Sequence, residues 1–346
     1  MKCFRIPLFI GVLFLTACGI PKNPGLYTDN AYDKAINACR ELLQDQVQDQ
    51  YPGYVIAVAK DNQLLWKEGF GFANIEKKIP MSADDELRSY SVAKNWTSTA
   101  AIKLVEAGKL DFQSKLKDLI SDIPSAWDEI TVYQLGTHHS GIRHYRDDQE
   151  AANPGNCQTI DQALELFKND PLVHQPGKEY LYSTWGYVVL SKVIAEVSGE
   201  TYLQAMNELV FNPASMKVGF AGQTTPGIQY YNLNPATNSW ILSDANPSCK
   251  WGGGGLIATV ESLVHFDQAM LQGILVNSDM TNLVLEPNPD SIAITHGISE
   301  GGWASVYTDM RNGISIAFMA NARGKTMELP EIERLLKSIE SYFSKS

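Results

Sequence analysis

The sequence predicts a mixed fold, in which both ends of the chain contribute strands to one antiparallel sheet and the middle forms helices. Segments rich in β-branched and aromatic residues read as strands near each end, at 54–59 and 64–66 and again at 303–307 and 314–320. The stretch between them has mainly helical periodicity. The predicted fold class is therefore an α/β lobe combined with an all-α lobe.

The length of 346 residues suits one large domain made of two closely packed lobes. We expect the α/β lobe to be built from residues 29–86 and 291–346, and the helical lobe from residues 87–290. No internal repeat or low-complexity segment is visible.

The first residues have the features of a bacterial lipoprotein signal. Lys2 and Arg5 precede a short apolar run that ends in Leu15-Thr16-Ala17-Cys18. We expect residues 1–17 to be removed, Cys18 to be lipidated and residues 18–28 to act as a tether. Gly19 lacks the acidic side chain that favours inner-membrane retention, so we expect the periplasmic side of the outer membrane. A plain secretory signal is the alternative.

Charge and cysteine content exclude some functions. The net charge is −11, and no basic tract offers nucleic acid a binding surface. After processing, Cys39, Cys157 and Cys249 remain, which allows one disulfide and one free thiol without naming the pair. No Cys-x-x-Cys occurs, so we expect no structural zinc site.

The N-terminal part begins with an amphipathic helix expected over residues 29–48 and a hairpin turning at Asp61-Asn62. A long, largely apolar helix follows and ends at Gly108. The better helical segments after it are 110–123, 131–135, 159–168 and 185–197.

The C-terminal part begins with an irregular region over residues 207–251, which is rich in Asn, Pro and Gly. Thr259 is expected to cap a helix that runs to Met270. Asn312-Gly313 predicts a hairpin between the last two strands, and residues 331–343 form the final helix.

Ser91 and Lys94 are the first candidates for chemistry, because three positions of separation put them on the same face of a helix. In apolar surroundings a lysine loses solvation and can accept a proton near neutral pH. A serine at a helix N-terminus meets free N–H groups that favour negative charge. The pair therefore reads as a nucleophile with its proton acceptor. The spacing alone is weak, since Ser114 and Lys117 also fit it.

Further candidates lie in two later segments. Tyr182 could exchange a proton with a serine if it lies near a lysine, although a packed aromatic residue is the simpler reading. Thr184 adds a hydroxyl on the same turn. His296 precedes a strand whose N–H groups could face a bound carbonyl, although the pattern by itself favours an ordinary loop histidine.

Two other clusters are less informative. His138, His139 and His144 lack the spacing and the supporting carboxylate of a zinc site. The glycines at 252–255 are not followed by Lys-Ser/Thr, so a flexible turn beside a substrate cleft is favoured over a phosphate loop.

In this order, the motifs resemble those of the serine β-lactamase/penicillin-binding protein family, especially its class C-like branch. The resemblance covers residues 51–322 and rests on four segments: Leu87 to Lys94, Leu104 to Asp111, Thr137 to Tyr145 and Tyr182 to Tyr187, with Lys250-Trp251 and the glycines beyond. It implies a β-lactamase/transpeptidase-like fold with the site between the two lobes, and no cofactor or metal.

By this resemblance Ser91 is acylated, and Lys94 and Tyr182 manage its proton. The N–H groups of Ser91 and Ser299 would form the oxyanion hole, with His296 in the slot that holds Lys in Lys-Thr-Gly.

Two departures from the family pattern stand out. Thr184 replaces the Asn of Tyr-x-Asn, and Gly297-Ile298 puts a branched side chain where close substrate approach favours glycine. Only a short span also separates Leu271 from His296, so part of the cleft wall is expected to be missing or rebuilt.

The expected function is that of a lipid-anchored serine hydrolase of the cell envelope, acting on small peptide, amide or ester substrates. A penicillin-binding D,D-peptidase or a β-lactamase is the alternative within the family. A non-catalytic binding or scaffold protein is the alternative of another class.

Overall fold

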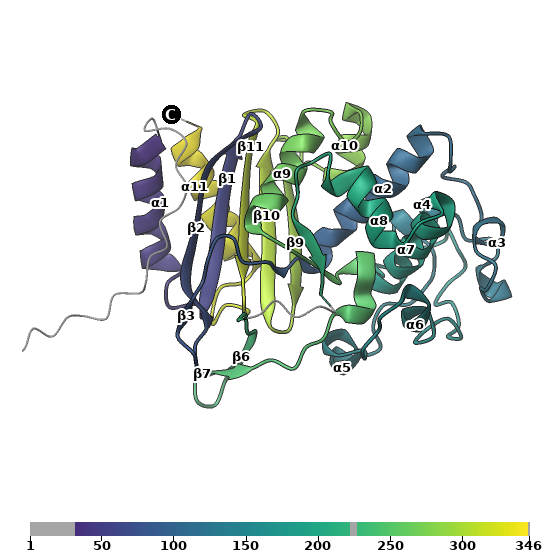
Figure 1. Cartoon of the computed structure of the whole chain (residues 1–346), viewed down its shortest axis with the longest axis horizontal. Helices are drawn as coiled ribbons and strands as arrows, with labels where there is room; N and C mark the ends of the chain where they lie inside the picture. The colour runs from purple at the N-terminus through teal and green to yellow at the C-terminus, as the bar shows by residue number, and fades with distance from the viewer. Residues whose placement is uncertain (1–31, 222–226, 345–346) are drawn as a thin grey trace, which may run out of the picture.

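The computed structural model describes residues 32–221 and 227–344. The predicted signal, the lipidation site Cys18 and the tether lie outside these residues. Six antiparallel strands form the main sheet in the order β3-β2-β1-β11-β10-β9 (Figure 1). Their bounds are β1 Gly53–Lys60, β2 Gln63–Asn74, β3 Ile79–Pro80, β9 Ile292–Ser299, β10 Gly302–Asp309 and β11 Ile314–Ala320.

The two ends of the chain meet at the centre of this sheet. Strand β1 pairs with β2 on one side and with β11 on the other, so that Ala57 lies opposite both Lys67 and Ala317. Every residue of β11 is buried, as in a strand covered on both faces. The predicted sheet from both chain ends is confirmed, and the hairpin at Asn312-Gly313 joins β10 to β11.

Helices α1 (Asp33–Gln46) and α11 (Leu329–Phe343) cover one face of the sheet (Figure 1). Their apolar stripes pack with inward residues of the strands, including Ile36, Leu336 and Phe318. Helix α11 begins two residues before the predicted start, because Glu328 forms a capping box with Glu331 and Pro330 fits the first turn.

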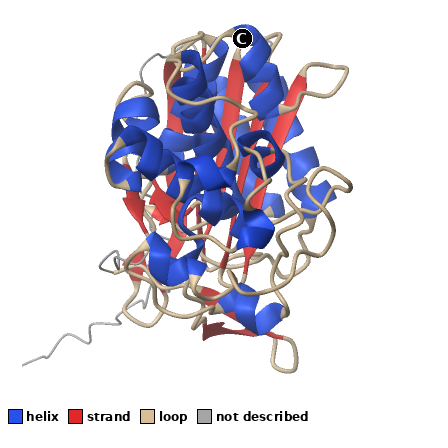
Figure 2. Cartoon of the chain, turned by 90° about the vertical axis from the view of Figure 1, so that its right-hand side faces the viewer, coloured by secondary structure: helices blue, strands red, loops and turns tan. Residues whose placement is uncertain are grey.

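The opposite face carries α9 (Val260–Leu271) and the helical part of the molecule (Figure 1). Figure 2 shows the molecule from this side, with helices in front of the strands. Thr259 caps α9 through Ser262, as predicted. One continuous core joins this face of the sheet to the helices, from Val55 and Ala57 through Phe266 to Trp96. The sheet and the helical part therefore share a single core, which holds their elements in fixed positions relative to one another.

The helical part is built around α2 (Ala93–Glu106), which is largely buried. The other helices are α3 Leu116–Leu119, α4 Val132–Gly136, α5 Asp148–Ala152, α6 Ile160–Leu164, α7 Thr184–Ser198, α8 Tyr202–Met206 and α10 Ser278–Leu285. The helix predicted over residues 110–123 is wrong except at its centre, where α3 forms. Asp111 instead accepts from the backbone of Gln113, which favours a turn over a helix.

The region expected to be irregular, 207–251, holds short regular elements. A π-helical turn spans Asn207–Phe211, and β6 (Tyr231–Asn234) forms a hairpin with β7 (Ser239–Leu242). A small second sheet joins β4 (Leu87–Arg88), β8 (Leu256–Ala258) and β5 (Val218–Phe220). Within the described residues, no helix has the length and apolar character needed to cross a membrane.

Candidate active site

Ser91 lies in a short turn directly before the buried helix α2. Strand β4 pairs with β8, and a 3₁₀ turn (Tyr90–Val92) then connects β4 to α2. Ser89 anchors this turn, because its N–H and its hydroxyl both donate to the carbonyl of Leu256, at 2.9 and 2.8 Å. The Ser91 hydroxyl consequently sits at the N-terminal end of α2, where negative charge is stabilised.

Lys94 is 4 % exposed and uses all its donors. An ammonium group has three N–H donors. They reach Ser91 Oγ at 3.1 Å, Thr184 Oγ1 at 3.2 Å and the carbonyl oxygen of Gly253. Each donor of Lys94 therefore has an acceptor, and one of these hydrogen bonds holds the Ser91 hydroxyl in place.

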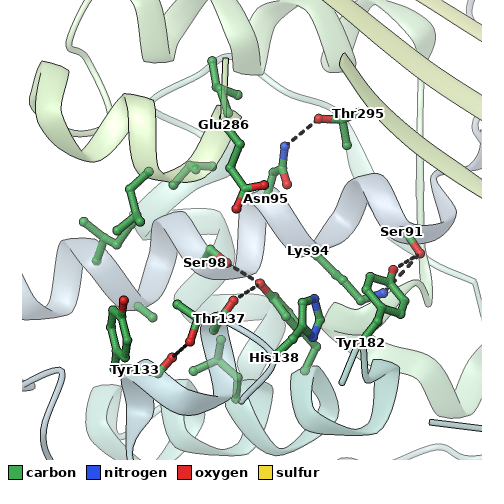
Figure 3. A pocket seen from close by; sticks show the side chains of 18 of the residues that line it. Ser91, Lys94, Asn95, Ser98, Tyr133, Thr137, His138, Tyr182, Glu286 and Thr295 are labelled. Atoms are coloured by element: carbon green, nitrogen blue, oxygen red, sulfur yellow. Dashed lines mark hydrogen bonds between the residues drawn. The ribbon is translucent and has the colours of Figure 1, made fainter. Parts of the chain in front are cut away.

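Tyr182 completes the group, because its hydroxyl donates to Ser91 Oγ at 2.7 Å (Figure 3). Burial alone would raise the pKa of the phenol. The Lys94 charge and hydrogen bonds with Lys94 and Ser91 outweigh burial and lower the pKa of Tyr182 below its ordinary value. A phenol with a lowered pKa, bonded to a serine hydroxyl, is suited to take the serine's proton.

Two histidines position the Tyr182 segment. His138 Nδ1 accepts from the Ser183 N–H at 3.1 Å, and His144 Nδ1 accepts from the Thr184 N–H at 3.2 Å. Burial and the nearby Lys94 charge lower the pKa of His138 to about 3 and that of His144 to about 4, so both rings are neutral and can accept.

Sequence reasoning missed this role of the two histidines. Their partners are backbone groups 45 and 40 positions away, which no local spacing reveals. In the described part of the chain, no three His, Cys, Asp or Glu side chains are grouped to hold a metal ion.

The glycine run is closely packed instead of flexible. A Cβ on Gly253 would lie 2.7 Å from both Thr184 Cγ2 and the Thr184 carbonyl oxygen. The preceding carbonyl of Gly252 accepts from Thr97 of α2 at 2.9 Å. Glycine therefore allows this segment to approach α2 and α7 closely enough to offer its carbonyl to Lys94.

Strand β9 forms the other wall of the site and is an edge strand of the sheet. Gly297 lies against the serine turn, since a Cβ there would come within 2.4 Å of the Ser89 carbonyl and 2.8 Å of the Ser91 nitrogen. Ser299, two positions further on, shares this face of the strand. The oxyanion hole expected from its N–H and that of Ser91 stays a prediction.

The expectations for His296 and Ile298 do not match their placement. Side chains alternate along β9, and Ile298 packs with the core under α1 and α11. The expected intrusion of this side chain into the cleft is therefore wrong, because Gly297 is the residue that meets the serine turn. His296 contributes to the pocket wall, yet its ring nitrogens contact Ser305 at 2.7 Å and Glu333 of α11 at 3.2 Å. The structure does not bring this ring to Ser91.

Lys250 is a cation beside the site to which sequence reasoning assigned no role. Its ammonium donates to the Ala151 carbonyl and to Ser299 Oγ, the latter at 3.4 Å. Burial, reinforced by the charges of Lys94 and Arg88, lowers the pKa of Lys250 to about 7. It lies far from Ser91 along the chain, so no local spacing singled it out.

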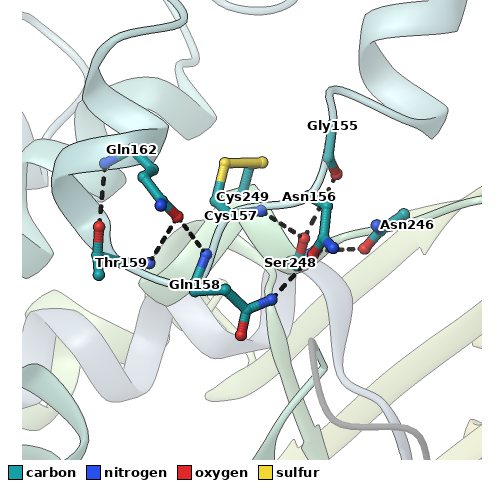
Figure 4. The surroundings of a disulfide bond; sticks show 9 residues. All are labelled: Gly155, Asn156, Cys157, Gln158, Thr159, Gln162, Asn246, Ser248 and Cys249. Atoms are coloured by element: carbon teal, nitrogen blue, oxygen red, sulfur yellow. Dashed lines mark hydrogen bonds between the residues drawn. A yellow bond between two sulfur atoms is a disulfide. The ribbon is translucent and has the colours of Figure 1, made fainter.

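A disulfide between Cys157 and Cys249 anchors the segment that carries Lys250 (Figure 4). Ser248 reinforces the link by accepting from the Cys157 N–H at 3.1 Å. Cys39 is a buried free thiol. The structure thus contains the one disulfide and the one free thiol that the sequence allowed, and it identifies Cys157 and Cys249 as the pair.

A pocket of about 600 Å³ opens from Ser91 and runs along α2 (Figure 3). Its walls come from α2, α4, α10, β9 and the loops around His138 and Tyr180. Part of the cleft wall was expected to be missing or rebuilt in the short stretch between Leu271 and His296. In the described structure α10 is the one helix between α9 and β9, and its residues line the pocket there.

The fold and the Ser91–Lys94–Tyr182 group together define a class, the β-lactamase-related proteins. The Beta-lactamase family model matches residues 39–340, and the chain belongs to this family. The predicted family and fold are confirmed.

Relatives and solved structures agree with this assignment. The human mitochondrial serine beta-lactamase-like protein LACTB is 28% identical over 74% of this chain and 60% of its own length. D-aminopeptidase from Brucella anthropi is 26% identical over 63% of this chain and 42% of its own length. The structure of D-amino acid amidase from Ochrobactrum anthropi SV3 has a TM-score of 0.76 at 18% identity, covering 90% of this chain and 99% of that one. The chain thus spans about 60% of the length of the LACTB proteins it matches.

Proposed function

We propose that this protein is a serine hydrolase that cleaves amide or ester substrates through an acyl-enzyme. The observation that carries the proposal is the hydrogen-bonded group in which Ser91 Oγ contacts both Tyr182 Oη and Lys94 Nζ. The D-aminopeptidase relative supports an amide as the scissile bond.

The proposed reaction begins when the Tyr182 phenolate takes the proton of Ser91 Oγ, and this oxygen attacks the substrate carbonyl carbon. The N–H groups of Ser91 and Ser299 stabilise the oxyanion. Tyr182 returns the proton to the departing nitrogen or oxygen as its bond to carbon breaks. Water then attacks the acyl-enzyme, giving its proton to Tyr182, and Ser91 leaves with that proton. Lys94 stabilises the phenolate throughout.

The two alternatives are weighed by particular residues. Thr184 stands at the position of the family's Asn, and its hydroxyl already accepts from Lys94, which argues against efficient β-lactam recognition. A non-catalytic scaffold would have no need for a serine, a lysine and a tyrosine held within hydrogen-bond distance.

Amides and esters should accordingly be better substrates than penicillins. We expect turnover of a simple D-amino acid amide or a chromogenic ester, and benzylpenicillin hydrolysis below about 1 per second, at the lower limit of typical enzyme rates. Steady-state kinetics on the three substrates measures this. Penicillin turnover of about 10–10³ per second would contradict the assignment and favour a β-lactamase.

We further propose that the protein is lipid-anchored in the bacterial cell envelope, on the periplasmic side of the outer membrane. The Leu15-Thr16-Ala17-Cys18 motif supports the anchor, and the Cys157–Cys249 disulfide supports an oxidising compartment.

Replacing the proposed anchor gives a direct test of the location. Cys18→Ser should move the protein from the membrane fraction to the soluble fraction of a bacterial host, because the acyl chains that hold it are lost. Cys39→Ser is the matched control, since Cys39 is a buried thiol in α1. Membrane association that survives Cys18→Ser would refute the anchor.

A further inference from the structure

The pocket beside Ser91 is elongated and follows one face of α2. Ser91, Asn95, Ser98 and Ile102 all line it, and their spacing of three or four residues repeats along a single helix face. At 1.5 Å per residue, the distance along the axis from Ser91 to Ile102 is about 16 Å. Figure 3 shows Ser91 at one end and Tyr133 at the other. The pocket has room for an extended group and not only for the reacting atoms.

Part of the wall of this groove is aromatic and apolar. Tyr133, Tyr180 and Leu283 line it and are 46%, 64% and 42% exposed, which is unusual for side chains of this size. Phe112 and Val132 continue the apolar surface. Exposed apolar side chains gathered around a concave surface mark a place where an apolar partner group is buried.

The charge of the groove is set by Glu286. Lys94 and Glu286 are the only Lys, Arg, Asp or Glu side chains among the lining residues, and Lys94 already donates to three acceptors. The Glu286 carboxylate has no hydrogen bond or ion pair with any residue that the structure describes. It points into the groove beside Asn95 (Figure 3).

The backbone reinforces this charge. Glu286 caps the C-terminal end of α10 with φ 49°, a left-handed conformation that glycine usually takes. The C-terminal end of a helix carries partial negative charge, which adds to that of the carboxylate. A groove that carries both a carboxylate and exposed aromatic rings has the chemistry that recognises an ammonium group.

The position of Tyr182 indicates which part of the substrate enters the groove. Tyr182 lines the groove, whereas Thr184, Ser299 and Lys250 lie outside its lining. In the proposed reaction Tyr182 protonates the departing atom, so the departing group must lie on the side of Tyr182. The alcohol or amine part of the substrate therefore extends along α2.

Resting on the proposed function, we infer that Ser91 acts on esters or amides whose departing alcohol or amine has an apolar stem with a positively charged group, which Glu286 receives. The reaction transfers the acyl group to Ser91 and then to water, and it releases the cationic alcohol or amine. A substrate with a carboxylate on the same stem is disfavoured, because Glu286 repels it.

Three acetate esters with the same hexyl stem test this inference. The stem ends in trimethylammonium, in its neutral isostere tert-butyl, or in carboxylate, and acetate release is followed by titration. We expect kcat/KM for the ammonium ester to exceed that for the tert-butyl ester by about tenfold, from one exposed ion pair and cation–π contact. The carboxylate ester should be the poorest substrate. Glu286→Gln should lower the ammonium-to-tert-butyl ratio, because only the cation–π contribution then remains.

Asp290→Asn is the matched control, because Asp290 is an exposed carboxylate outside the groove lining, and its ratio should stay at the wild-type value. A wild-type ratio of one or less, or a ratio that Glu286→Gln leaves unchanged, overturns the inference while the proposed function stands. If no ester is cleaved, a neutral fluorophosphonate is used, and hexyltrimethylammonium should protect Ser91 from labelling better than its neutral isostere. Equal protection overturns the inference, and a serine that is never labelled overturns the proposed function with it.

Discussion

Ser91→Ala is expected to lower the hydrolysis of a simple chromogenic ester by about 10⁴–10⁶-fold, because removal of a nucleophile leaves only binding and the oxyanion donors. The variant should fold normally, since the change only removes a hydroxyl oxygen from a side chain that lines a pocket. Initial rates at saturating and limiting substrate measure the loss.

Ser114→Ala is the matched control for this change. Ser114 and Lys117 have the same spacing as Ser91 and Lys94, but Lys117 is engaged with Glu129 on the surface. Its activity should equal that of the wild type. A large loss in Ser114→Ala, or full activity in Ser91→Ala, would assign the chemistry to a different serine.

Tyr182→Phe is expected to lower the acylation rate by about 10²–10⁴-fold, because the proton of Ser91 then has no acceptor. The active form of Tyr182 is the phenolate, and Lys94 favours it. The midpoint of the pH–rate profile should therefore lie below the ordinary tyrosine pKa of 10. The wild-type rate should therefore rise with pH up to that midpoint and then level off. This limb should vanish in Tyr182→Phe.

Two further variants make the pH dependence specific. In Lys94→Met the phenolate loses its counter-charge, so the midpoint should move upward and the rate at neutral pH should fall by a comparable factor. Tyr187→Phe is the control, since Tyr187 contacts Ser98 and the Gly136 carbonyl and not Ser91. A wild-type limb that persists in Tyr182→Phe would show that another group takes the proton.

The core of the site could be predicted from the sequence for a physical reason. Ser91 and Lys94 belong to one helix, so their spacing alone places them on the same face. Tyr182 and Thr184 lie on another element, and only the resemblance to a family connected them with the serine. The structure brings these four side chains together around the Lys94 ammonium.

The errors at β9 have a different cause. A strand pattern shows that side chains alternate, but it does not show which set faces the cleft. That choice depends on the packing of Ile298 under α1 and α11 and on the contact between His296 and Glu333. Neither contact is local. The roles of His138, His144 and Lys250 were missed for the same reason, since their partners lie far along the chain.

The secondary-structure elements also divide into those that the sequence predicts and those that it does not. Strongly periodic elements such as β1, β11, α9 and α11 were predicted because local pattern and tertiary packing agree. The short strands β5, β6 and β7 were not, because each has only three or four residues and is held by pairing with another strand.

Intact-mass spectrometry after fluorophosphonate treatment tests the central claim most directly. We expect one phosphonyl adduct per chain, mapped by peptide digestion to Ser91 and absent in Ser91→Ala. A folded wild-type protein that gains no mass, or an adduct mapped to another serine, would contradict the claim that Ser91 is the nucleophile of an acyl-enzyme.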